Sequence, residues 1–104
     1  MYRNKETKIM TMTTSVKHEM FVREPMGDKD VCELAGIGPR CAELFRNLGF
    51  DKAYNLLGQF LILNQDEEMF CAWLAQEISD GHAMSKKHRT DVYHCLKQWC
   101  QNNL

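Results

Sequence analysis

The stretch Gly36-Ile37-Gly38-Pro39 combines residue types and spacing that could do chemistry. Two glycines around an isoleucine describe a tight turn, and a proline at the first helical position predicts that a helix begins there. The first amides of a helix have no intrahelical acceptor and lie at the positive end of the helix dipole. The stretch therefore predicts an anion site, and a phosphate group is the natural ligand.

Cations elsewhere in the chain could support a phosphate at this turn. Arg40 falls in the first turn of the predicted helix, and Lys17 could add charge nearby, although each could equally be an ordinary surface residue. Lys86 and Lys87 stand at the start of the last predicted helix, where a positive charge opposes the helix dipole. Helix stability does not explain their position, so they could form a second phosphate contact.

Helices must position these groups, because apolar residues recur at helical spacing and no alternating strand pattern is present. We expect a first helix after the hydroxyl cluster at 13–15 that ends before Pro25, a short helix over 31–34 capped by Asp30, and a hairpin helix from Pro39 to near Leu48 followed by Gly49. We expect three more helices over 52–63, from Asp66 to 78, and from 85 to 101, the first of them capped by Asp51.

The expected helix over 52–63 is apolar nearly all the way round. A helix of this kind in a small domain needs burial on more than one side. One side can face the domain core, and the other could face a partner. Residues 1–11 are polar and without periodicity, so we expect a disordered N-terminal extension before a helical domain at 12–104.

Composition sets the class of protein. The chain has 104 residues, of which 44% are hydrophobic and 26% charged, which predicts one folded domain. No apolar run approaches the ~20 residues of a membrane span, and no signal-peptide core is present. The net charge of −1 does not by itself indicate a nucleic-acid binder, but acids gather in 51–84 and bases in 85–104. We expect one acidic and one basic surface on a protein of the cytosol or nucleus.

Enzymatic and metal-binding patterns are absent from the sequence. It holds no P-loop, nucleophile elbow or zinc-deaminase signature, and Glu43 fits a solvated charge better than a general base. The five cysteines include no C-x-x-C pair, which favours reduced thiols over a metal site. We expect neither an enzyme nor a protein with a metal or cofactor.

The glycine turn resembles the helix-hairpin-helix motif, which binds duplex DNA through backbone amides without reading bases, although twelve residues could also form a plain turn between helices. Read end to end, residues 12–104 are similar to the barrier-to-autointegration factor family. The resemblance is carried by Leu34-Ala35-Gly36-Ile37-Gly38 and by the blocks at 12–15, 17–18, 21–22, 24–27, 49–54, 57–61, 66–67, 73–74, 95–96 and 99–100.

This resemblance implies a compact, five-helix, SAM-like all-α domain that forms a homodimer, binds double-stranded DNA without sequence preference and bridges duplexes. It also implies LEM-domain proteins, lamin and histones as partners, at chromatin and the nuclear envelope and also in the cytoplasm. Carried over by position, the DNA-binding residues are Lys17, Gly36, Ile37, Gly38, Arg40, Cys41, Lys86 and Lys87; the dimer and partner surface includes Leu57, Gly58 and Trp73; and the phosphorylation cluster is Thr13, Thr14 and Ser15.

The sequence also departs from the pattern of this family. Glu19, Glu43, Leu44 and the pair at 64–65 stand where typical members have basic residues. Each lost phosphate contact lowers the salt dependence of DNA binding, so an alternative interpretation stays open. In that interpretation the chain keeps the fold but binds DNA weakly, and acts as an adaptor or as a heterodimerising regulator.

Overall fold

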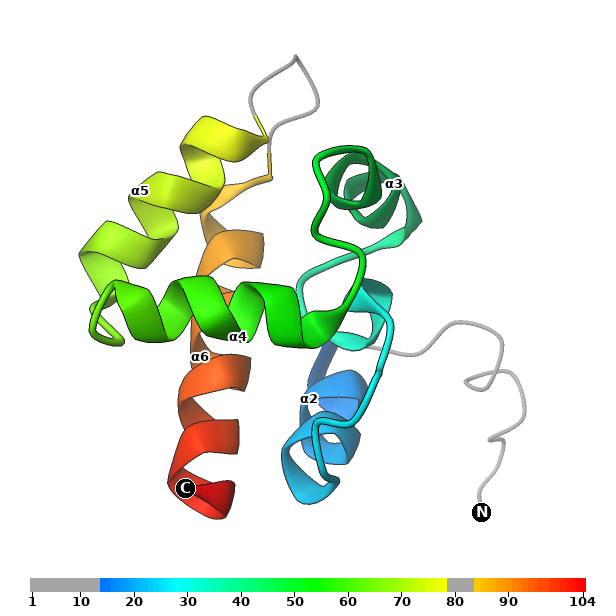
Figure 1. The fold of residues 1–104 in the computed structure, drawn as a ribbon, viewed down its shortest axis with the longest axis vertical. Helices are drawn as coiled ribbons and strands as arrows, with labels where there is room; N and C mark the ends of the chain where they lie inside the picture. The colour runs from blue at the N-terminus through cyan, green and yellow to red at the C-terminus, as the bar shows by residue number, and fades with distance from the viewer. Residues whose placement is uncertain (1–13, 79–83) are drawn as a thin grey trace.

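The computed structural model describes residues 14–78 and 84–104, which form five α-helices and one short 3₁₀ helix (Figure 1). The elements are α2 (Thr14–Arg23), η1 (Val31–Glu33), α3 (Pro39–Asn47), α4 (Ala53–Ile62), α5 (Glu67–Glu77) and α6 (Lys86–Asn103). The predicted all-α fold is confirmed. The expected extension at 1–11, Thr13 and most of the loop before the last helix lie outside the described residues.

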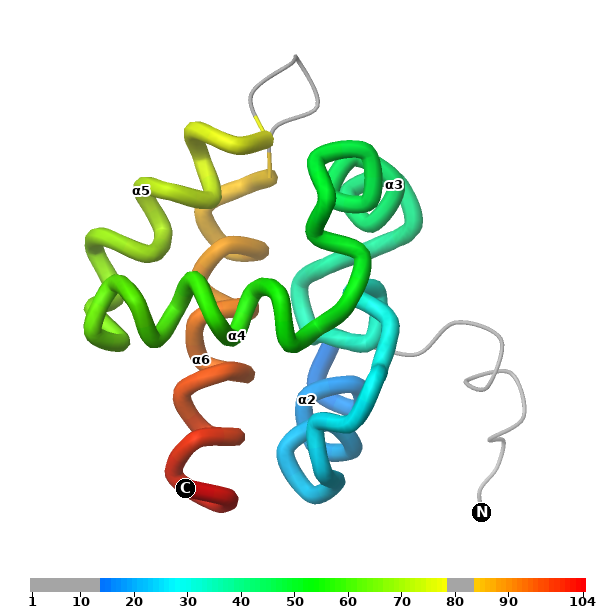
Figure 2. Tube along the Cα trace, viewed as in Figure 1, coloured from blue at the N-terminus to red at the C-terminus, as the bar shows by residue number. Residues whose placement is uncertain are grey.

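Helix α6 is the longest element and the one against which the others are arranged. It packs along α2 on one side and along α5 on the other, while α4 crosses in front of it (Figure 2). Its buried side chains recur every three to four residues and are all apolar: Val92, Cys95, Leu96, Trp99 and Cys100. This stripe is the one expected from helical periodicity, so α6 joins both halves of the molecule through a single core.

Aromatic side chains fill the centre of this core. Phe45, Phe60 and Phe70 have no exposed surface, and the rings of Phe60 and Phe70 meet edge to face with centroids 5.2 Å apart. None of the described polar or charged residues is buried. The fold therefore depends on apolar packing, and its charged groups remain available at the surface. Leu48, near which the hairpin helix was expected to end, is the C-cap residue of α3 and is 48% exposed.

Side chains cap three of the described helices, and one of these caps, Asp30, was predicted from the sequence. Asp30 accepts a hydrogen bond from the amide of Cys32, Asp66 from that of Met69, and Ser85 from that of His88. The predicted cap at Asp51 is wrong, because α4 begins one residue later with Lys52 at its N-cap. Asp51 instead uses its backbone carbonyl to accept the amide of Val31 at 3.0 Å, which joins the start of α4 to η1.

An ion pair joins the two helical arms around the glycine turn. Arg46 of α3 donates through Nη2 to Asp30 Oδ2 at 2.8 Å, and Asp30 caps η1 at the same time. The hydrogen bonds from Arg46 and Cys32 hold the pKa of Asp30 well below its usual range. A single carboxylate thus fixes η1 relative to α3.

We expect Asp30→Asn to remove a pH-dependent part of the stability. Asparagine keeps the capping oxygen but loses the charge that faces Arg46. Because the folded-state pKa of Asp30 is depressed, its contribution is full above the unfolded-state pKa of about 4 and is lost as the pH falls through the folded-state pKa. Urea unfolding of both proteins from pH 7 to pH 2 measures this. The difference in unfolding free energy should shrink in acid; a difference that stays constant over the series would contradict the assignment.

Candidate nucleic-acid interface

Gly36 holds the predicted turn directly against α6. Its φ of +93° is one that other residues rarely adopt, and a Cβ added there would lie 2.5 Å from the backbone oxygen of His88 and 2.9 Å from Val92 Cγ2. The turn backbone is therefore packed on the first turns of α6. As a result, the turn and the start of α6 form one continuous surface.

Gly38 has the opposite character, although it looks equivalent in sequence. It is exposed, its φ of −91° is ordinary, and a Cβ added there would meet nothing within 4 Å. It is the N-cap residue of α3 and offers no side-chain cap, while Pro39 follows at the first helical position. The N-terminus of α3 is thus open toward solvent, as an anion site at a helix start requires.

A cleft of about 300 Å³ surrounds this helix start. It brings together most residues that the resemblance assigned to DNA: the lining residues are Thr14, Lys17, Gly36, Ile37, Gly38, Pro39, Arg40, Cys41 and His88. We call it the hairpin cleft. Ile37 as a whole is 1% exposed, so its side chain does not reach a ligand in the cleft. His88 was not predicted from the sequence. It lines the cleft because the turn at Gly36 packs against the backbone oxygen of His88.

Lys17 reaches the turn from α2. Its Nζ donates to the backbone oxygen of Ile37 at 2.8 Å, and burial lowers the pKa of this half-buried ammonium group. Lys17 forms none of the ion pairs in the described part of the chain. Its positive charge is therefore held at the hairpin without a neutralising carboxylate.

The two adjacent lysines at the start of α6 face different clefts. Lys87 lines a cleft of about 290 Å³ with Thr14, Ser15 and His18, and its Nζ lies 2.9 Å from Asp91 Oδ2. This cleft adjoins the hairpin cleft, because Thr14 lines both. The structure thus brings Lys87 and the two described hydroxyl residues of the predicted phosphorylation cluster to the same side of the molecule as the turn.

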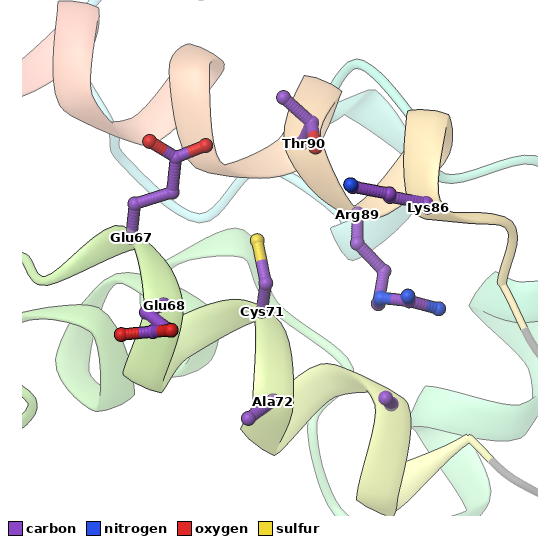
Figure 3. Close-up of a pocket in the computed structure, with 8 residues that line it drawn as sticks. Glu67, Glu68, Cys71, Ala72, Lys86, Arg89 and Thr90 are labelled. Carbon is purple, nitrogen blue, oxygen red and sulfur yellow. The ribbon is translucent and has the colours of Figure 1, made fainter.

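Lys86 instead points over the groove between α5 and α6 (Figure 3). It lines a cleft of about 450 Å³ with Arg89, while Glu67 and Glu68 line the part of the cleft contributed by the start of α5. Neighbouring residues on a helix point about 100° apart, which separates Lys86 from Lys87. The structure does not bring Lys86 into the hairpin cleft, and its role in DNA binding stays a prediction.

Comparison with known proteins identifies the family of this chain. A family model described as barrier to autointegration factor matches residues 12–103. The chain is 48% identical over 92 residues to barrier-to-autointegration factor of Danio rerio, which covers 88% of this chain and 98% of the relative. It is 51% identical over 88 residues to barrier-to-autointegration factor A of Xenopus laevis (85% and 93%) and 48% identical over 89 residues to the Homo sapiens protein (86% and 96%). The chain belongs to the barrier-to-autointegration factor family.

Membership of the barrier-to-autointegration factor family confirms the resemblance drawn from the sequence blocks and agrees with the all-α fold. The residues that the resemblance assigned to the dimer and partner surface, Leu57, Gly58 and Trp73, lie on α4 and α5. All three are half-buried, and the Trp73 ring packs edge to face on Phe50 with centroids 5.3 Å apart. The exposed apolar side chains on these helices were missed by position-by-position transfer: Tyr54, Leu61, Ile62 and Met69. We call these four residues, together with Leu57, Gly58 and Trp73, the apolar surface.

None of the five cysteines, all of which lie within the described residues, forms a disulfide bond in the structure. Burial raises the pKa of the Cys95 thiol to about 11, so it stays protonated and acts as a core residue. In the described parts of the chain, no three His, Cys, Asp or Glu residues gather where they could hold a metal ion. No helix among the described residues is long and apolar enough to cross a membrane.

We expect Gly36→Ala to destabilise the fold by about 1–3 kcal/mol, because alanine is strained at this φ and its Cβ would collide with the α6 backbone. Gly38→Ser is the matched control, since a serine side chain at that position has space, an ordinary φ and a favourable capping oxygen. Thermal and urea unfolding of the two variants measures the contrast. Equal stability of Gly36→Ala and Gly38→Ser would contradict the close packing of the turn on α6.

Proposed function

We propose that this protein binds double-stranded DNA through the hairpin cleft and, as a homodimer, bridges two duplexes. The observation that carries the proposal is the uncapped start of α3 at Gly38, open to solvent inside a cleft that also holds Lys17 and Arg40. Backbone amides and cations of this kind recognise phosphate oxygens. Such contacts read no base edges, so binding is independent of sequence.

A second copy of the chain is the proposed occupant of the apolar surface. Tyr54, Leu61, Ile62 and Met69 are all exposed, and a group of exposed apolar side chains favours burial against a partner. A two-fold dimer formed through this surface would carry two hairpin clefts, one per subunit, and could hold two duplexes. The family resemblance further suggests that LEM-domain proteins bind across the dimer, with lamin and histones as other partners, in the nucleus, at its envelope and also in the cytoplasm.

Phosphorylation is the proposed control of this interface. Thr14 and Ser15 line the cleft that contains Lys87, whereas Thr13 lies outside the described residues. A phosphoryl group adds a charge of about −1.5 to −2 and would repel the DNA backbone from this side. The change requires no rearrangement of the fold.

A second candidate function follows from the exposed acids on two of the helices that contribute to the hairpin cleft. Glu19 and Glu43 are exposed, and Lys87 is already paired with Asp91. The carboxylates weaken the attraction of DNA phosphates. They favour a protein that binds DNA weakly and acts through the apolar surface as an adaptor or heterodimerising regulator. The strength of duplex binding decides between the two functions.

We expect Gly38→Asp to weaken duplex binding about 10-fold or more relative to Gly38→Asn. Both side chains cap α3 and have almost the same shape, so only the charge at the phosphate site differs. Fluorescence anisotropy with a short duplex, repeated over a range of salt concentrations, measures the affinities. Wild-type protein that binds no duplex at low salt would favour the adaptor function. Equal affinities of the two variants would show that DNA binds elsewhere.

We expect Ile62→Glu to convert the dimer into a monomer, because a buried carboxylate would face the partner. The subunit should stay folded, since Ile62 is 73% exposed within it. Leu48→Glu is the control, an equally drastic change at an exposed apolar residue of the α3 end. Light scattering gives the mass. A monomeric Ile62→Glu should still bind one duplex but no longer bridge two; an unchanged mass would contradict the proposed interface.

A further inference from the structure

The contact between Lys17 and the turn affects the direction in which a backbone amide of the turn points. Lys17 donates to the carbonyl oxygen of Ile37, the residue directly before Gly38. The carbonyl of Ile37 and the amide of Gly38 belong to the same peptide unit. In a trans peptide such as this one, the C=O and N–H bonds point in opposite directions. A hydrogen bond that fixes the carbonyl therefore also fixes the amide.

The amide of Gly38 is placed to use this orientation. Gly38 is exposed and lines the hairpin cleft, and in the described residues its amide donates no hydrogen bond. With the Ile37 carbonyl directed toward Lys17, this N–H points away from α2. A charged donor at 2.8 Å also polarises the peptide unit, which makes its N–H a stronger donor.

The surroundings of Lys17 agree with a role inside the protein. The group is half-buried, and the titratable groups that act electrostatically on it are Cys32, Cys95 and Glu33, none of which forms an ion pair with it. Arg40 differs, because it is exposed on the first turn of α3. The backbone groups next to the Ile37–Gly38 peptide unit are held by other bonds, because the Ile37 amide donates to the Leu34 oxygen at 3.2 Å and the Gly38 oxygen accepts from the Ala42 amide at 2.9 Å. Lys17 supplies the hydrogen bond to the peptide unit between them.

We propose that Lys17 is a positioning residue: its ammonium group holds the Ile37–Gly38 peptide unit so that the Gly38 amide is aimed at a DNA phosphate. This rests on the proposed function for the identity of the ligand. The orientation of the amide exists in the free protein and is tested there, independently of DNA. Lys17 contributes to affinity through Gly38, beyond the long-range attraction of its charge.

The test compares Lys17→Met, Lys17→Arg and Arg40→Gln by amide NMR of the full chain without DNA. We expect Lys17→Met to move the Gly38 amide resonance, with the Gly58 amide on α4 as the internal reference. Arginine can still donate to the Ile37 oxygen, so Lys17→Arg should restore the resonance toward its wild-type position. Arg40→Gln removes a nearby charge and should leave it unmoved. In wild type, the Lys17 ammonium protons should exchange slowly and show a coupling across the hydrogen bond to the Ile37 carbonyl carbon.

Duplex affinities of the same variants complete the test. We expect Lys17→Met to lose about 10-fold in affinity, the cost of a misdirected hydrogen bond to a charged group, and more than Arg40→Gln loses. Two results would overturn the positioning role. One is a Gly38 amide resonance that does not move in Lys17→Met, and the other is a wild-type Lys17 ammonium group without a coupling to the Ile37 carbonyl carbon. Wild-type protein that binds no duplex would instead overturn the proposed function, and the NMR spectra of the free protein would still decide whether Lys17 orients the Gly38 amide.

Discussion

The close contact between Gly36 and the backbone of α6 is the constraint on which the interface depends. A single missing methyl group lets the turn backbone approach the oxygen of His88. This contact sets the distance of the turn from α6 and places Lys87, on the neighbouring cleft, within the same surface. The Asp30–Arg46 pair also joins η1 to α3, but it is exposed and therefore weak, so it does not position the turn against α6. Close packing at one residue thus assembles a site from three helices.

Local signals predicted the fold well, and they failed where tertiary contacts decide. Helical periodicity and the cap at Asp30 identified helices correctly, because both act within one turn of the chain. The sequence presents Gly36 and Gly38 as a symmetrical pair. Only the structure shows that Gly36 is needed for close packing on α6, whereas Gly38 leaves the start of α3 open to solvent. The cap expected at Asp51 was wrong for a similar reason, since its carbonyl pairs with η1, a distant partner that local rules do not include.

The candidate site was predicted in part. Transfer by position identified Lys17, Arg40 and the turn, and these line one cleft. It treated Lys86 and Lys87 as one unit, whereas the helical rotation sends them to separate clefts. It missed His88, because the sequence carries no sign that a residue of the last helix lies against the turn. Adjacency in sequence is a poor guide to adjacency on a helix surface.

A net charge of −1 is compatible with a phosphate site, because part of this site is formed by backbone amides. Formal charge ignores the partial positive charge at the start of α3, where the amides lie at the end of the helix dipole. Lys17 adds a full charge that meets a carbonyl instead of a carboxylate, so it remains uncancelled at the turn. Lys87, in contrast, is partly neutralised by Asp91. The two positive contributions, from the start of α3 and from Lys17, lie next to each other at the hairpin in a protein whose net charge is −1, and their effect decays over about 8–10 Å at physiological salt. Such a short-range effect favours a phosphate held in contact with the turn, and it attracts distant DNA much less than a strongly basic surface would.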